Sequence, residues 1–202
     1  LFFYNGTGIS YASSLDGDAW TIRGALGLNT HDFTVAYHTV PAAAAYALVA
    51  AASGDDIYFF RGEITSSENI TFDAAVKVFD HAVSGLEYSR PSLAVSTASE
   101  FVWVAAVAAV PGTDYAERLR AWTVRSDEGV TGDLSAGNWG TVVAAAPAGL
   151  ITATLTDALV MPQSGDRMAL ILNTQAPNIV AWTCDGVSAT WTEANGTAYS
   201  RF

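Results

Sequence analysis

The sequence predicts an all-β protein built from repeated antiparallel units, and three observations lead to this expectation. Short runs rich in Val, Ile, Thr, Tyr, Phe and Trp follow one another along the whole chain, as strands do. Gly, Asn, Asp and Ser gather between these runs, where tight turns need them. Aromatic residues return at comparable places roughly every 50 to 60 residues, which indicates internal repeats of about four strands each.

The repeats divide the 202 residues into four units within a single domain. The aromatic residues that open the last strand of each unit are Trp20, Phe72, Trp139 and Trp191. This period is typical of the four-stranded blades of a β-propeller. We therefore expect a β-propeller of about four four-stranded antiparallel blades, with a fragment of a six- or seven-bladed propeller as the alternative. The expected blades are 1–25 plus 198–202, 31–80, 88–147 and 150–193.

The first blade opens with an expected strand at Leu1–Tyr4. The residues Asn5-Gly6-Thr7-Gly8 then predict a hairpin that leads into Ile9–Ala12. A turn at Asp16 leads to a third strand at Trp20–Arg23. These strands form an antiparallel meander.

The C-terminal residues are expected to complete this first blade. Ala198-Tyr199-Ser200-Arg201-Phe202 repeats the pattern of Glu87-Tyr88-Ser89-Arg90-Pro91, which lies at the start of the third blade. Pairing of this last strand into the first blade would close the ring and remove exposed sheet edges.

Each remaining blade is expected to contain four strands joined mostly by short turns. Tyr46–Ala52 is nearly continuously apolar, as in a strand buried on both faces. A helix over Ala42–Ala52 is the alternative, since Ala is the best helix former, but the turn Ser53-Gly54-Asp55-Asp56 that follows favours a strand. The expected strands are 33–38, 46–52, 57–64 and 70–78, then 88–95, 100–110, 118–125 and 139–145, then 153–160, 167–172, 179–183 and 189–192.

The stretch Ser14-Leu15-Asp16-Gly17-Asp18-Ala19-Trp20 has the composition of a tight turn between strands. Its Asp16 can accept hydrogen bonds from the turn's own N–H groups, and Gly17 can adopt a positive φ. Trp20 is expected to cap the hydrophobic layer where the next strand begins. A second copy, Thr183-Cys184-Asp185-Gly186, ends on Trp191, and Ser126-Asp127-Glu128-Gly129 predicts a third acid–glycine turn.

These motifs resemble the Asp-box, or BNR repeat, of sialidase-like β-propellers, whose usual form is Ser-x-Asp-x-Gly-x-x-Trp. The match is partial, because one residue is missing between Asp16 and Gly17 and the second copy has a longer tail. The resemblance implies a propeller fold with the motifs on its outer rim, away from an active face. The residues to which it gives this structural role are Ser14, Asp16, Gly17, Trp20, Asp127, Gly129, Asp185, Gly186 and Trp191.

The charge of the chain argues against several classes of partner. It carries 9 Lys and Arg against 20 Asp and Glu, a formal net charge of −11, so we expect no binding to nucleic acid or to an anionic membrane surface. The longest apolar run, Val40–Ala52, is too short to span a bilayer. Cys184 is the single cysteine, and the three histidines lack zinc-site spacing, so we expect no disulfide within the chain, no metal and no cofactor.

Three Asn-x-Thr sequons begin at Asn5, Asn69 and Asn195. Each is an N-glycosylation acceptor if the chain passes through a eukaryotic secretory pathway. Together with the acidic charge, they favour an extracellular or cell-surface location. The chain also begins at Leu1 rather than Met, which we expect of a processed product or a fragment.

Arg90-Pro91 is the feature closest to an enzyme signal. It partly resembles the sialidase arginine that is followed by proline and that clamps the substrate carboxylate through a bidentate contact. That mechanism also needs further arginines, an Asp acid/base and a Tyr activated by a Glu, and a Tyr–Glu couple cannot be placed in this sequence. The candidate ligand face, expected near the first strands of the blades, consists of Arg90, Arg201, Tyr88, Tyr199, Asp32 and His31.

We therefore expect a non-catalytic β-propeller module for assembly or recognition, with a protein or a glycan as its partner. A sialidase-like glycoside hydrolase is one alternative, and a structural repeat subunit of a filament or particle shell is another. Self-association is compatible with each of these functions. The loops Pro111–Glu117 and Ser126–Asn138 are where the sequence places a partner surface.

Overall fold

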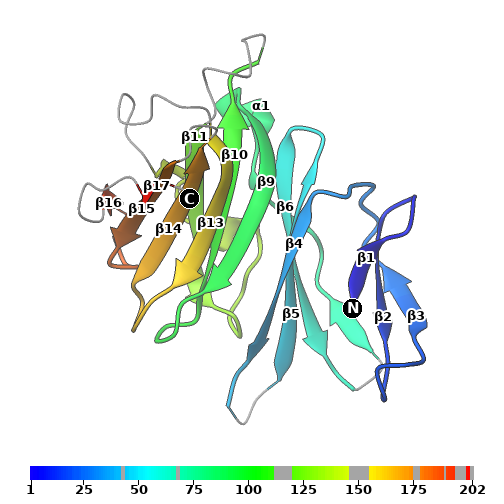
Figure 1. Ribbon diagram of the computed structural model, residues 1–202. Coiled ribbons are helices and arrows are strands. Elements are labelled where there is room, and N and C mark those ends of the chain that lie inside the picture. Colours follow the sequence, from blue (N-terminus) through cyan, green and yellow to red (C-terminus); the bar gives the residue numbers. More distant parts are fainter. Residues whose placement is uncertain are drawn as a thin grey trace.

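The structure is a computed structural model that describes residues 1–41, 44–66, 69–111, 120–145, 155–174, 178–188, 190–193 and 199–200. This part of the chain is all-β and forms four antiparallel sheets of three to five strands (Figure 1). We number the sheets 1 to 4 in chain order. The expectation of an all-β protein made of antiparallel units is thereby confirmed.

Sheets 1 and 2 are meanders from the N-terminal part of the chain. Sheet 1 has the order β1 (Phe2–Tyr4), β2 (Ile9–Ser13), β3 (Thr21–Ala25). Sheet 2 has the order β4 (Phe33–Thr39), β5 (Ala45–Ser53), β6 (Asp56–Ile64), β7 (Ile70–Phe72), with β8 (Val76–Phe79) also paired to β6. The Ala-rich segment is the strand β5, as expected, and not a helix.

Sheets 3 and 4 repeat this plan. Sheet 3 has the order β9 (Glu87–Val95), β10 (Phe101–Ala109), β11 (Arg120–Gly129), β12 (Val143–Ala144). Sheet 4 has the order β13 (Leu155–Pro162), β14 (Met168–Thr174), β15 (Asn178–Cys184), β16 (Thr192–Glu193), with β17 (Tyr199–Ser200) also paired to β15. A helical turn, α1 (His81–Ser84), precedes β9, and a 3-10 helix, η2 (Ala136–Asn138), precedes β12. The sequence predicted neither turn.

One expected strand is two strands in the structure. The segment 70–78 divides into β7 and β8 on either side of Asp73. The N–H of Asp73 donates to the carbonyl of Arg61 at 2.9 Å, and the Asp73 carboxylate pairs with the Arg61 guanidinium. These contacts bend the chain, so that β7 and β8 pair with different parts of β6.

Sheets 2, 3 and 4 stack face to face, and apolar side chains fill the spaces between them. One core lies between sheets 2 and 3 and includes Leu48, Phe59 and Val104. A second core lies between sheets 3 and 4 and includes Trp103 and Leu170. Successive residues of β10 point to opposite faces and enter different cores, which is why this strand is continuously apolar.

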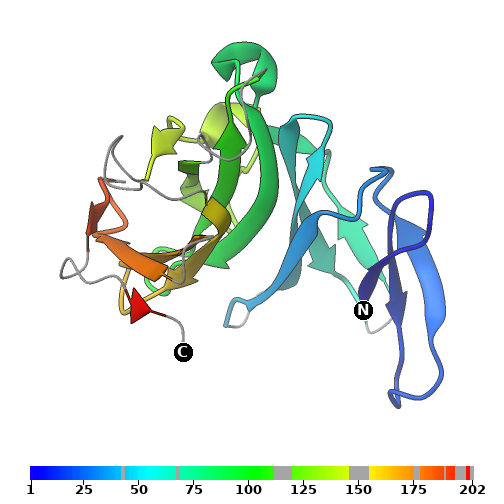
Figure 2. The same cartoon turned by 45° about the horizontal axis from the view of Figure 1, so that its top comes forward.

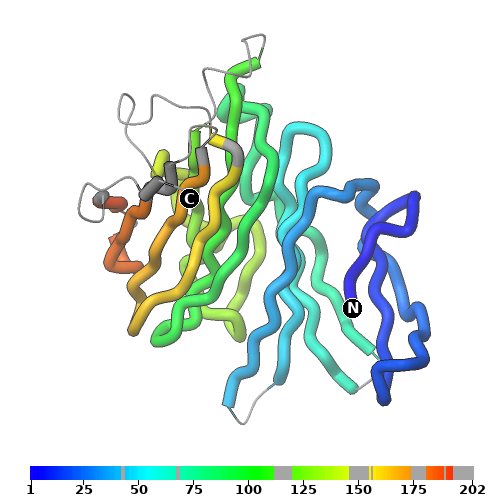
Figure 3. The backbone as a smooth tube through the Cα atoms, viewed as in Figure 1, coloured from blue at the N-terminus to red at the C-terminus, as the bar shows by residue number. Residues whose placement is uncertain are grey.

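The four sheets follow one another across the molecule, from sheet 1 with the N-terminus to sheet 4 on the opposite side (Figures 1 and 2). The tube in Figure 3 shows the same course without the arrows. Within the described residues, no strand of sheet 4 is hydrogen-bonded to sheet 1.

The expected pairing of the C-terminal strand into the first blade is therefore wrong. Tyr199 and Ser200 of β17 lie opposite Ile179 and Asn178 of β15, within sheet 4. This part of the β15 edge is open because β16 pairs only with Trp182 and Thr183. Pairing with the open edge of β15 satisfies main-chain hydrogen-bonding groups of β17 locally, so the chain does not need to cross to sheet 1.

Candidate functional site

The acid–glycine turns at Asp16 and Asp185 share one geometry. Oδ1 of Asp16 accepts the N–H groups of Asp18 and Ala19 at 2.9 and 3.1 Å, and Oδ1 of Asp185 accepts those of Val187 and Ser188 at 2.9 Å each. The glycine after each acid has a positive φ, +85° and +81°. The pKa of the Asp16 carboxyl lies below its usual value, chiefly because of the main-chain N–H of Ala19 and then that of Asp18. The pKa of the Asp185 carboxyl is lowered in the same way, chiefly by the main-chain N–H of Ser188.

The two turns occupy the same place in their sheets. The turn at Asp16 joins β2 to β3, and the turn at Asp185 joins β15 to β16, so each leads into the last strand of its meander. Sheets 1 and 4 are therefore related by an internal repeat that includes the turn as well as the strands.

The tryptophans that follow these turns have different surroundings. Trp191 is buried, stands edge-on to Trp103 and donates its indole N–H to Oγ1 of Thr123 at 2.8 Å. Trp20 is 50% exposed and donates its indole N–H to the carbonyl of Gly17 within its own turn. The expectation that Trp20 caps a hydrophobic layer is wrong, because no layer covers it as sheet 3 covers Trp191.

The third acid–glycine motif does not form a turn of this type. Asp127 and Gly129 lie within β11, whose last residue is Gly129. The hydroxyl of Ser126, fully buried, donates to the carbonyl of Glu128 and accepts the N–H of Val102. These bonds fasten the end of β11 to β10, so the chain turns only after Gly129.

Asp32 and Arg90 are brought together from the candidate ligand face. Oδ2 of Asp32, just before β4, accepts the main-chain N–H of Arg90 in β9 at 2.7 Å. Arg90 has a φ of +52°, which is strained for a residue with a side chain, and its side chain is exposed. Asp32 thus holds β9 in an unusual conformation beside the first strand of sheet 2.

The other members of the expected face that the structure describes are not gathered there. Tyr88 is 3% exposed and packs on Phe79 in the core between sheets 2 and 3, where burial raises its pKa. His31 is exposed, and its ring lies 6.0 Å from that of Tyr4 on sheet 1. Tyr199 belongs to β17 on the β15 side of sheet 4, and Arg201 lies outside the described residues.

The sequon asparagines differ in what their side chains do. Oδ1 of Asn5 accepts the N–H groups of Thr7 and Gly8, and its Nδ2 donates to Ser10, so this amide is committed to the hairpin turn. Asn69 is exposed at the start of β7. Asn195 lies outside the described residues, as does most of the loop Pro111–Glu117.

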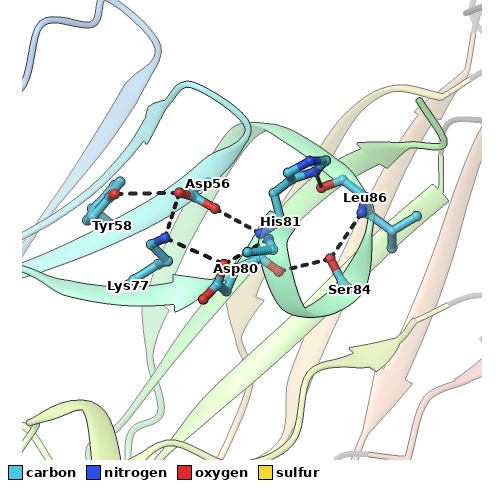
Figure 4. Close-up of polar contacts among 8 residues, drawn as sticks. Asp56, Tyr58, Lys77, Asp80, His81, Ser84 and Leu86 are labelled. Atoms are coloured by element: carbon cyan, nitrogen blue, oxygen red, sulfur yellow. Dashed lines mark hydrogen bonds and ion pairs between the residues drawn. The ribbon is translucent and has the colours of Figure 1, made fainter. Parts of the chain in front are cut away.

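A polar cluster joins β6, β8 and α1 (Figure 4). Lys77 lies 2.8 Å from Asp56 and 3.5 Å from Asp80, while Asp56 accepts the N–H of His81 and Asp80 caps α1 through the N–H of Ala82. Burial alone would raise the pKa of Asp56, but the bonds from Lys77 and His81 outweigh it and lower that pKa. Both carboxylates contact Lys77, and each also accepts a main-chain N–H, which indicates a structural role.

A largely apolar groove lies between sheets 1 and 2. It has a volume of about 390 Å³, and its aromatic residues include Trp20, 50% exposed, and Tyr37, 66% exposed. Serine hydroxyls and the Asn69 amide add a few polar groups to an apolar lining, a combination typical of binding sites. The side chains that define this aromatic groove are Phe2, Tyr11, Trp20, Val35, Tyr37 and Ile70.

Sequence reasoning missed the aromatic groove because its walls come from different sheets. The sequence predicted that these residues belong to strands and turns, but no single segment could predict that sheet 1 packs beside sheet 2. The aromatic contacts of Phe2 and Tyr11 with Phe72, at 6.3 and 5.7 Å, set the position of sheet 1. The aromatic residues that gather near the N-terminus were the one feature of the sequence that could have indicated the groove.

The groove has groups that can bind a ligand. Its described lining offers hydroxyls, an amide and aromatic faces. Among the described residues, no group of three or more His, Cys, Asp or Glu is placed to hold a metal ion. Within the same ranges, no helix has the length and apolar character needed to cross a membrane.

Comparisons with models of known protein families and with curated protein sequences found no match to this chain. The choice of site therefore depends on the contacts, exposure and chemistry of its own residues.

Proposed function

We propose that this protein is a non-catalytic recognition or assembly module and that the aromatic groove is its binding surface. The observation that carries this proposal is the exposure of Trp20 and Tyr37, 50% and 66%, in a hollow of about 390 Å³. Large exposed aromatic side chains around one hollow are typical of interaction sites. A partner that covers them buries apolar surface and can also form hydrogen bonds with their polar groups.

The bonds and pKa directions of three carboxylates, those of Asp16, Asp166 and Asp185, fit a non-catalytic role. Oδ1 and Oδ2 of Asp166 accept the hydroxyls of Ser96 and Ser99, and Asp16 and Asp185 accept main-chain N–H groups. The pKa values of all three carboxyls lie below the usual range. A carboxyl with a lowered pKa stays ionised near neutral pH and is a poor proton donor.

The architecture supports a propeller-type module, and the sequons support a place for it outside the cell or at its surface. Successive sheets stack face to face, and the acid–glycine turns lie at one place in the repeat, as in the family that the motif resembles. Of the two sequon asparagines that the structure describes, Asn69 is exposed, whereas the Asn5 amide is bonded within its own turn. The protein partner or glycan would then meet the groove in solution.

The test is a ligand screen with matched variants. The wild-type protein is applied to a peptide-display library and to a glycan array, and each hit is remeasured with Trp20→Ala, Tyr37→Ser and the control Val83→Ala. Val83 is 85% exposed on α1, outside the groove, so its change should be silent. We expect hits whose affinity falls about tenfold or more in both groove variants. Hits that all keep their affinity in these variants would overturn the proposed surface.

Arg90 favours a second candidate function, that of a sialidase-like glycoside hydrolase. Its exposed side chain, strained backbone and bond to Asp32 are features that recur at functional sites. A fluorogenic sialoside panel assayed with wild type and Arg90→Ala separates the two functions. We expect no turnover; hydrolysis that Arg90→Ala abolishes would establish the enzyme instead.

A further inference from the structure

A second hollow, with a volume of about 370 Å³, lies between sheets 2 and 3 and shares no lining residue with the aromatic groove. One wall is the bend between β7 and β8, and the other is the segment that leads into η2. Both walls belong to the middle of the chain. We name this site the acidic hollow, and its lining includes Phe59, Val76, Leu134, Arg61, Asp73 and Asp133.

Arg61 holds the two walls of the acidic hollow together. Its Nη1 donates to the carbonyl of Val130 at 2.7 Å, and its Nε and Nη2 contact Oδ2 of Asp73 at 2.7 and 2.6 Å. The side chain of Arg61 is 19% exposed, whereas that of Asp73 is 54% exposed. The positive charge is therefore largely covered, while the carboxylate faces the solvent.

Asp133 adds a second carboxylate, on the other wall. Its Oδ1 accepts the main-chain N–H of Ser135 at 2.9 Å, and this bond is the main reason why the pKa of Asp133 lies below its usual value. Asp133 is exposed and stays ionised near neutral pH. Glu128 accepts the N–H of Asp133 at 2.7 Å and brings a further negative charge to this wall. A cation that enters the hollow therefore meets carboxylates on its exposed side.

The remaining lining of the acidic hollow is mostly apolar. Ala74, Ala75 and Ala136 are exposed there, and Val76 and Leu134 belong to the same surface. A hydrocarbon chain laid on this surface would be removed from water, which is favourable. An apolar surface beside carboxylates suits a side chain with an apolar stem and a cationic head, as in lysine and arginine.

The carboxylates favour lysine over arginine. A guanidinium pairs best with both oxygens of one carboxylate, but Oδ2 of Asp73 already receives two nitrogens of Arg61. Oδ1 of Asp133 is likewise bonded to the N–H of Ser135. The three donors of an ammonium can instead reach single oxygens that belong to two different residues.

We propose that the acidic hollow binds a lysine side chain of a partner protein, with the stem on the apolar lining and the ammonium between Asp73 and Asp133. A basic partner segment also suits the net charge of −11 of this chain. The site is separate from the aromatic groove, so the inference goes beyond the proposed function and can fail while that function stands.

The probe is the acetylated and amidated pentapeptide Gly-Ala-Lys-Ala-Gly, and binding is followed through the NMR shifts of the Ala75 and Ser135 amides. The control peptide carries Nε-acetyl-lysine, which keeps the stem but has no charge. We expect saturable shifts with a Kd of about 1 mM and binding about fivefold or more weaker for the acetylated form. Raising NaCl from about 50 to about 500 mM should weaken the binding of the lysine peptide.

Two variants test the carboxylates. Asp73→Asn and Asp133→Asn each remove one charge from the hollow, whereas Asp55→Asn removes a charge from the exposed turn between β5 and β6. We expect the lysine peptide to bind about threefold more weakly to each hollow variant and to bind Asp55→Asn like wild type. Because Asp73 also pairs with Arg61, its variant can lose stability. The Asp133 variant and the acetylated peptide keep the test decisive in that case.

Several results would overturn the inference. These are no saturable binding of the lysine peptide, equal binding of the acetylated form, wild-type binding by both hollow variants, and shifts confined to amides outside the hollow. An arginine peptide that binds as tightly as the lysine peptide would overturn the choice of lysine. If CaCl₂ shifts the Ala75 and Ser135 amides and the lysine peptide does not, the hollow is a metal-ion site instead. Ligands of the aromatic groove, measured with the Trp20 and Tyr37 variants, decide the proposed function separately.

Discussion

Arg61 and Arg125 occupy matching places on the third strands of neighbouring sheets, and each fastens its own sheet to the next. Nη1 of Arg61 in β6 donates to the carbonyls of Val130 and Gly132, which follow β11. Nη1 of Arg125 in β11 donates to the carbonyls of Gly186 and Val187, which follow β15, at 3.0 and 2.8 Å. The stack of sheets is therefore held by a repeated polar clamp as well as by its apolar cores.

The clamp should contribute measurably to stability. We expect Arg61→Ala and Arg125→Ala each to lower the free energy of unfolding by about 2 kcal/mol, because charge-assisted bonds to two carbonyls are lost. Lysine at either position should restore only part of this, since an ammonium lacks the planar fork of guanidinium. Urea denaturation measures the effect, with the exposed Arg120→Ala as control. Equal midpoints for all variants would show that the clamp carries no stability.

The tryptophans after the two acid–glycine turns should respond differently to one substitution. Trp191→Phe removes the indole donor to the buried Thr123 hydroxyl, and we expect a loss of about 1 to 3 kcal/mol. Trp20→Phe alters a half-exposed ring and should cost about 0.5 kcal/mol or less. Thermal and urea unfolding compare the two. A larger loss for Trp20→Phe would contradict the assignment of their surroundings.

The glycines of these turns give a second matched pair. Gly17→Ala places a side chain at a positive φ in open space and should cost about 1 kcal/mol. Gly186→Ala adds the same strain, but the new Cβ would also meet the carbonyl of Asp166. We expect the second variant to be clearly the less stable in urea denaturation. Equal losses would mean that sheet 4 relaxes at this turn without cost.

Asp166 should make stability depend on pH in the acid range. Burial alone would raise its pKa, but bonds from the Ser99 hydroxyl, the Ser99 N–H and the Ser96 hydroxyl outweigh this and lower it from 3.8. A lowered pKa in the folded state contributes stability above the unfolded pKa, and this is lost as pH falls through the folded pKa. Asp166→Asn should thus be less stable than wild type at pH 7.

The difference between wild type and Asp166→Asn should shrink as the pH is lowered below 3.8. Thermal melts across this range measure it. An Arg167→Gln variant serves as control because Arg167 is an exposed neighbour of Asp166. A difference that stays constant down to the lowest pH would show that the Asp166 charge plays no part.

Local patterns were enough to locate most of the secondary structure. The turn after Ser53 and the apolar run before it identified β5 as a strand, and the hydroxyl, acid and glycine at Ser14, Asp16 and Gly17 identified their turn. These features depend on residues close together in the chain, whose backbone preferences act without help from distant segments. The break at Asp73 was missed because it depends on Arg61, a partner on another strand.

The amino-acid sequence by itself determined an all-β chain of repeated meanders with acid–glycine turns at matching places. Only the tertiary structure decided that Trp20 is exposed while Trp191 is buried, that Tyr88 belongs to the core, and that β17 pairs with β15. The physical reason is that burial and edge pairing depend on which sheet lies against which. Two segments that share an Asp-Gly turn followed by Trp therefore reach different surroundings, and the aromatic groove arises where one sheet is left incompletely covered.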